Sequence, residues 1–169
     1  DFGSSVNSIQ IQRGVGTSTN GAGAFGASVN LMTNEYNPSA YLSLQNTAGS
    51  FNSFKNNLVF GSGLLNNKFT IDGRVSSITS DGFIDRANSD LKSFFLSTTY
   101  WGEKSSLRLN VFSGKEKTYQ AWYGVPEELL NTNRTYNPAG TEKADAPYEN
   151  QTDNYSQTHY QLFYNENIN

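Results

Sequence analysis

A glycine-rich stretch between residues 12 and 33 constrains the fold of this chain more than any other segment. An alternating apolar run, Val6, Ile9 and Ile11, precedes it, and a second apolar run from Val29 to Met32 follows. Glycines lie between the two runs at positions 14, 16, 21, 23 and 26. Alternation predicts strands, and glycine permits the positive φ and close backbone approach that a tight connection requires. The sequence therefore predicts two strands joined by a small-residue loop that packs closely against a neighbouring surface.

Further segments alternate apolar and polar side chains, as strands do when their two faces meet different environments. In the clearest of them Phe69, Ile71 and Val75 alternate with polar neighbours. The pattern predicts an all-β chain that folds as an antiparallel meander with one apolar face. We expect the strands at about residues 40–46, 53–64, 68–77, 90–101, 105–115 and 159–165.

Composition excludes several classes of protein. The formal net charge is −3 and no basic block occurs, which argues against binding to nucleic acid. The chain has no cysteine, so neither a disulfide framework nor a thiolate metal site can form. No apolar run has the length of a transmembrane helix. The single histidine, His159, is expected at a strand rim, and the carboxylates of Glu127, Glu128, Asp81 and Asp85 are expected in solvated loops. We therefore expect no enzyme activity, no cofactor and no metal site.

The glycine-rich stretch carries an ordered set of residues that points to one family. The set is Arg13-Gly14, Ser18, Gly21, Gly26, Val29-Asn30-Leu31 and Thr33. In this order and spacing the chain resembles the end of the plug domain of TonB-dependent outer-membrane receptors. It departs from the family pattern at Gly26-Ala27, where relatives prefer two adjacent glycines.

The resemblance implies a division of the chain and a cellular role. Residues 1–33 would form the end of the plug, 34–39 a connector, and 40–169 the first strands of a transmembrane β-barrel. The parent receptor would import a scarce nutrient, such as a siderophore, cobalamin, haem or a glycan, across the outer membrane of a Gram-negative bacterium. TonB would act on a segment upstream of Asp1, so we expect the chain to be a piece of a longer protein. Arg13 would lie inside the barrel and contact acidic groups on its wall.

Connection lengths give an independent signal for the same architecture. Short turns are expected after the second and fourth barrel strands, whereas longer loops, 79–89 and 116–158, follow the third and fifth. Outer-membrane barrels alternate short periplasmic turns with long outer loops in this way. The first outer loop, 47–50, is a short exception. Six strands cannot close a plugged barrel of ~22 strands, so the expected partners are lipid and the remainder of the receptor barrel.

Two questions remain open in the sequence. An apolar face also suits a soluble sheet, so the alternative is a soluble or cell-surface β-sheet binding module or adhesin without a transport role. The long loop contains Tyr119, Trp122 and Tyr123, which are candidate contacts for a small nutrient ligand or, equally, anchors of the loop itself.

Overall fold

The computed structural model of the chain describes residues 3–14, 21, 23, 25–33, 36–140 and 151–168. These residues are all-β, with two short 3-10 turns, η1 (Gly3–Ser5) and η3 (Glu127–Leu129), in place of any longer helix. They form two compact units that divide between Asn37 and Pro38, inside the expected connector.

The smaller unit is a β-hairpin. Strand β1 (Ser8–Arg13) pairs antiparallel with β2 (Ala27–Met32), and the register places Ile9 opposite Leu31 and Ile11 opposite Val29. The two strands predicted to flank the glycine-rich stretch are therefore confirmed.

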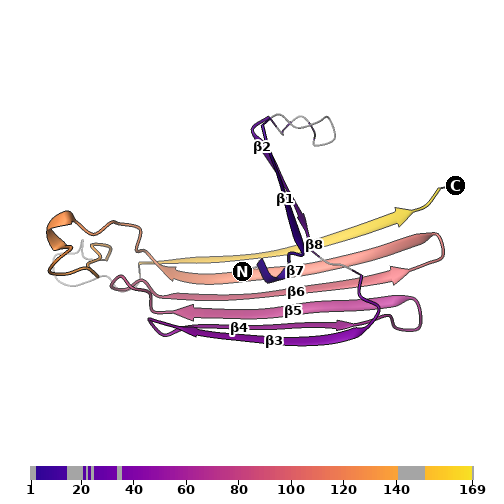
Figure 1. Cartoon of the computed structure of the whole chain (residues 1–169), viewed down its shortest axis with the longest axis horizontal. Coiled ribbons are helices and arrows are strands. Elements are labelled where there is room, and N and C mark those ends of the chain that lie inside the picture. Colours follow the sequence, from indigo (N-terminus) through magenta and orange to yellow (C-terminus); the bar gives the residue numbers. More distant parts are fainter. Residues whose placement is uncertain are drawn as a thin grey trace. The chain divides into compact units, whose positions relative to one another are not determined.

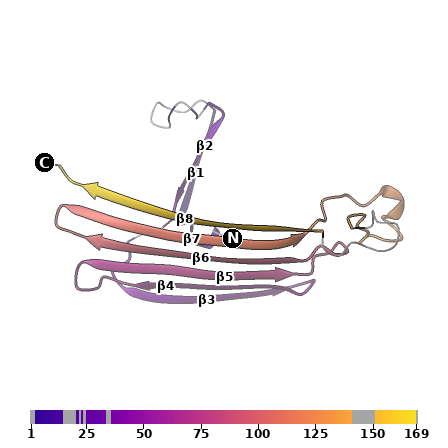
Figure 2. The ribbon, with the colours of Figure 1, turned by 180° about the vertical axis from the view of Figure 1, so that it is seen from behind.

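The larger unit is a six-stranded antiparallel sheet in which every strand pairs with the next one in the chain. Figures 1 and 2 show this meander from its two sides, with β3 and β8 as the edge strands. The predicted antiparallel meander is confirmed. The strands are β3 (Ala40–Gly49), β4 (Ser53–Ser62), β5 (Phe69–Ser80), β6 (Ser89–Trp101), β7 (Ser105–Tyr119) and β8 (Thr152–Glu166).

Connections alternate between the two ends of the sheet. The turns 63–68 and 102–104 lie at one end, called here the turn end, and 50–52, 81–88 and 120–140 lie at the other, called the loop end (Figure 1). In the first turn Asn66 and Asn67 have φ of 47° and 55°, as expected for asparagine in a tight connection. The predicted order of short turns and longer loops is present, including the short first loop.

Strands extend further toward the loop end than the sequence predicts. β7 continues to Tyr119 and β8 begins at Thr152, so 116–119 and 152–158, which the sequence assigns to the long loop, are strand residues. The side chains there are polar on both faces, so hydrophobic alternation fades although the backbone ladder continues through Lys117 and Asn154.

The sheet has one apolar and one polar face. Cross-strand partners share a face, and the row Leu42, Phe60, Leu96, Val111 and Tyr160 belongs to the apolar face. These side chains are not covered: Leu42 is 73% and Tyr160 is 74% exposed. Phe69, Ile71, Leu107 and Leu109 on the same face are also exposed, so no second layer from the described residues of the larger unit packs on them.

The polar face has the opposite burial. Asn57 is 1% and Arg74 is 2% exposed, and Arg74 donates a 3.0 Å hydrogen bond from Nη2 to Ser93 Oγ. Neighbouring serine, threonine and asparagine side chains on β5, β6 and β7 are buried with them. Within the described residues the buried hydrophobic side chains are limited to Phe95, Tyr119 and Ala139, so the sheet does not enclose an apolar core.

Candidate functional site

Two connections at the loop end are joined by a hydrogen-bond network centred on Asn137. Its side chain is 1% exposed and donates from Nδ2 to the carbonyl oxygens of Asp85 (2.9 Å) and Gln120 (3.2 Å). Its Oδ1 accepts from the backbone N–H of Ala139 at 3.0 Å. One buried amide thereby fixes the end of β7, the 81–88 loop and the 120–140 segment to one another. We call this the loop clamp.

Arg86 forms the second part of the loop clamp. From Nη2 it donates to the carbonyl oxygens of Asn137 and Ala139, the latter at 2.8 Å, and its guanidinium carbon lies 5.9 Å from the centroid of the Tyr119 ring. The backbone N–H of Asp85 donates to the carbonyl of Thr135 at 2.7 Å. Arg86 itself has φ of 61°, which a non-glycine residue keeps only where its surroundings compensate. The charge–carbonyl hydrogen bonds supply that compensation.

Tyr119 does not lie in a loop, contrary to the sequence-based expectation. It is the last residue of β7, its backbone N–H donates to the Asn88 carbonyl at 3.0 Å, and its ring is 8% exposed beneath Arg86. The position supports the loop clamp rather than presenting the ring to solvent.

Trp122 and Tyr123 are exposed and lie shortly after the end of β7, which the loop clamp holds. Trp122 is 65% exposed, and the two ring centroids lie 6.0 Å apart with an interplanar angle of 53°. The carbonyl of Gln120, two residues before the tryptophan, is held by Asn137. A pair of exposed rings on a fixed base can stack on a ligand that has a flat or sugar ring. That these rings contact a ligand stays a prediction.

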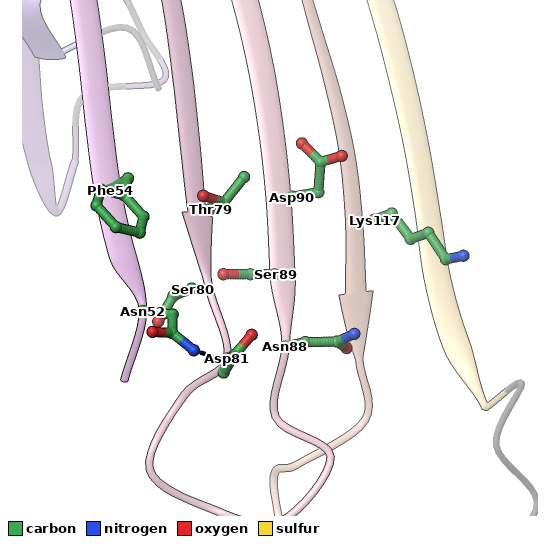
Figure 3. A pocket seen from close by; sticks show the side chains of 9 residues that line it. All are labelled: Asn52, Phe54, Thr79, Ser80, Asp81, Asn88, Ser89, Asp90 and Lys117. Atoms are coloured by element: carbon green, nitrogen blue, oxygen red, sulfur yellow. Dashed lines mark hydrogen bonds between the residues drawn. The ribbon is translucent and has the colours of Figure 1, made fainter. Parts of the chain in front are cut away.

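A polar groove of about 460 Å³ opens beside these loops at the loop end of the sheet (Figure 3). Its walls are mostly hydroxyl, amide and carboxylate side chains. Asn52 Nδ2 donates to Asp81 Oδ2 at 2.6 Å, and the Ser53 and Ser80 hydroxyl oxygens lie 2.7 Å apart. The lining residues are Asn52, Phe54, Thr79, Ser80, Asp81, Asn88, Ser89, Asp90 and Lys117. Sequence reasoning missed this groove because its residues come from β4, β5, β6, β7 and two connections.

The plug-motif residues lie in and around the hairpin. Arg13 ends β1 with an exposed side chain, and Asn30 of β2 pairs with Gln10. The N–H of Gly14 donates to the carbonyl of Gly26 at 2.9 Å, and Gly14 and Gly21 have φ of 80° and 78°. Ser18 lies outside the described residues.

Within the described part of the hairpin these glycines have open space around them, and their close packing against a neighbouring surface stays a prediction. A Cβ placed on Gly14, Gly21 or Gly26 would meet nothing within 4 Å. At Gly14 and Gly21 the glycine is required by the left-handed backbone, which side chains rarely adopt.

In the described part of the chain, no group of three or more His, Asp or Glu side chains could hold a metal ion. His159 lies inside β8 rather than at its rim, on the polar face, and its ring stacks on Phe112 with centroids 4.7 Å apart. Glu127 and Glu128 begin the 3-10 turn η3, within the connection that follows β7.

Comparison with known proteins does not name a family. No family model matches the chain, and no curated protein matches it either. A search of the described residues for a helix of sufficient length and apolarity to cross a membrane finds none.

Proposed function

We propose that this chain is the plug end and part of the barrel wall of a TonB-dependent outer-membrane receptor that imports a scarce nutrient. The single observation that carries the proposal is the reversed burial of the sheet. A soluble sheet hides its apolar face and wets its polar face. Here Leu42 and Tyr160 are exposed while Asn57 and Arg74 are buried. A barrel wall meets hydrocarbon outside and a polar lumen inside, which accounts for both faces.

The dimensions of the apolar face support the same proposal. Along β6 the apolar side chains run from Phe94 to Tyr100, about 20 Å at a strand rise of ~3.3 Å per residue. Membrane-spanning barrels have an apolar band about 25 Å tall, flanked by aromatic side chains. At the turn end the rings of Phe69 and Tyr100 lie 5.1 Å apart on this face, and Tyr164 follows in the same row. Trp101 belongs to the polar face, where Nε1 donates to Thr70 Oγ1 at 3.4 Å.

The sheet edges supply a third line of support. In the described residues β3 and β8 each pair with a strand on one side only. Lipid cannot satisfy the free backbone groups of an edge, so a membrane sheet of this kind must continue into further strands. The remainder of the receptor barrel fills that role in the proposal.

Site-directed spin labelling tests the membrane part of the proposal. The sequence has no cysteine, so single labels at Leu109→Cys and Asn110→Cys need no background correction. Positions 109 and 110 are neighbours on β7 and therefore lie on opposite faces of the sheet. The full-length protein is labelled after it is placed in a lipid bilayer. We expect the label at 109 to be accessible to oxygen and protected from a water-soluble nickel chelate, with the label at 110 lacking that lipid signature. High nickel accessibility at 109 would refute a lipid-facing wall.

Nutrient uptake tests the transport part. Cells with and without the gene are supplied with ferric siderophores, cobalamin, haem or oligosaccharides, and accumulation is measured with TonB intact or deleted. We expect one class to be taken up only when both the receptor and TonB are present. Surface binding that is unchanged by TonB deletion, with no accumulation, would instead identify a binding module or adhesin.

A further inference from the structure

A row of directly paired side chains crosses four strands in the groove at the loop end (Figure 3). The row joins β4, β5, β6 and β7 and consists of Phe54, Thr79, Asp90 and Lys117. Because directly paired residues of neighbouring strands share a face, the four side chains form one continuous surface. This surface combines an aromatic ring, a hydroxyl, a carboxylate and an ammonium group.

Hydrogen bonds hold further polar side chains of the groove in place. Asn52 Nδ2 donates to Asp81 Oδ2 at 2.6 Å, and the backbone N–H of Asp81 donates to the carbonyl of Phe51 at 2.9 Å. Ser80 Oγ accepts from the backbone N–H of Gly82 at 3.1 Å. The β3–β4 turn and the β5–β6 connection are thereby fixed to each other. Groups that are fixed in this way lose little freedom when a ligand binds.

One carboxylate oxygen of the groove lacks a donor. Asp90 Oδ1 is buried and accepts no hydrogen bond from the residues that the structure describes, whereas Oδ2 lies 3.1 Å from Lys92 Nζ. A buried acceptor without a donor is unfavourable. A ligand that carries hydroxyl groups would supply the missing donor.

The charge of the lining argues against an anionic ligand. Two carboxylates, those of Asp81 and Asp90, stand against the single ammonium group of Lys117, so the net charge of the groove is negative. Like charges brought together in a binding site are costly. The same carboxylates, with the amide of Asn88 and the hydroxyl of Ser89, suit an uncharged ligand with several hydroxyl groups.

Phe54 supplies the apolar part of the site, and its side chain is 51% exposed. A sugar ring has an apolar C–H surface and an edge of hydroxyl groups. An exposed aromatic ring can pack against the first while carboxylate, amide and hydroxyl side chains bind the second. The volume of about 460 Å³ lies within the range of pockets that hold small ligands.

We propose that this groove binds a sugar ring of an uncharged oligosaccharide. The proposal rests on the proposed function only for the position of the loop end outside the cell. It assigns a capture site at the rim of the wall and does not require the captured glycan to be the transported nutrient.

Titration of the purified full-length protein tests the proposal. The protein is held in micelles of a detergent without a sugar headgroup. The probes are neutral trisaccharides of glucose, galactose, mannose and N-acetylglucosamine, with trigalacturonic acid as the anionic comparison. The test variants are Phe54→Ala and Asp90→Ala. The matched control, Asp85→Ala, removes an exposed carboxylate from the neighbouring connection and leaves the lining of the groove intact.

We expect at least one neutral trisaccharide to bind the native protein and the control equally. Phe54→Ala should weaken that binding about 3- to 10-fold and Asp90→Ala about 10- to 100-fold. Trigalacturonic acid should bind the native protein at least about 10-fold more weakly than that trisaccharide.

Four results would each overturn the proposal: no binding of any neutral probe, equally tight binding of trigalacturonic acid, unchanged binding in both test variants, or an equal loss in Asp85→Ala. Failure of the proposed function would be seen separately. A protein that binds the trisaccharide but fails the uptake and spin-label tests would keep this sugar site and lose the receptor function.

Discussion

Replacing Leu109 with arginine measures which medium covers the apolar face. The side chain is 41% exposed and lies between Leu107 and Val111, in the middle of the exposed apolar stretch of β7. If hydrocarbon covers the face, the arginine costs about 2–4 kcal/mol of folding free energy, the value for a barrel position at the bilayer midplane. If water covers it, the change stays within about 0.5 kcal/mol. Ser113→Arg, on the same face toward the loop end, should cost about 0–1 kcal/mol.

Equilibrium unfolding of the full-length protein in bilayers of two thicknesses is the decisive assay. A buried soluble core would also reject arginine, but its cost would not depend on the lipid. In a membrane, a thinner bilayer brings position 109 nearer to the headgroups, so the cost of Leu109→Arg should fall while that of Ser113→Arg hardly changes. A neutral Leu109→Arg variant, or a cost that is the same in both bilayers, would refute the reasoning.

Further predictions concern the loops and one turn. Asn137→Ala removes three hydrogen bonds from a buried position and should destabilise the loop clamp by about 2–4 kcal/mol, seen as faster amide exchange in 120–140, whereas the exposed Asn131→Ala should leave exchange unchanged. Gly63→Ala should cost about 2–4 kcal/mol in urea unfolding, because φ is 65° and the added Cβ would lie 2.6 Å from a backbone nitrogen, whereas Gly49→Ala meets only an ordinary 3.7 Å contact. Trp122→Ala should weaken nutrient binding about 2- to 10-fold in a titration without changing the unfolding midpoint, because the ring is exposed.

Most of the sheet could be predicted from sequence because its signal is local. Phe69, Ile71 and Val75 alternate with polar residues, and that alternation alone fixes the strand and its faces. The signal fails where polarity becomes equal on both faces. Lys115 and Lys117 share the apolar face but no longer contrast with Glu116 on the other face, so the pattern predicts a loop where β7 continues to Tyr119.

The loop clamp could not be predicted because its partners are distant in the chain. Asn137 and Asp85 are 52 residues apart in the chain. Both lie in polar connections without the hydrophobic alternation that predicts burial. A second long-range contact, between Arg86 and Tyr119, explains why the prediction of an exposed Tyr119 is wrong. An aromatic residue in a polar segment is expected to be exposed, but Arg86 arrives from another connection and covers it.

The apolar face changes character along its strands, and this gradient limits what can lie against it. Phe69, Tyr100 and Tyr164 lie at the turn end, and Lys92 and Lys115 lie at the loop end, with an exposed apolar stretch between them. A sheet that packs on a protein core does not require aromatic, apolar and charged side chains in this order, because the core is apolar along the whole strand. A sheet that crosses from one polar boundary through hydrocarbon to another does require it. The cost of arginine at successive positions along β7 therefore samples this gradient, and a cost that falls from position 109 to position 113 would be hard to obtain from any soluble packing.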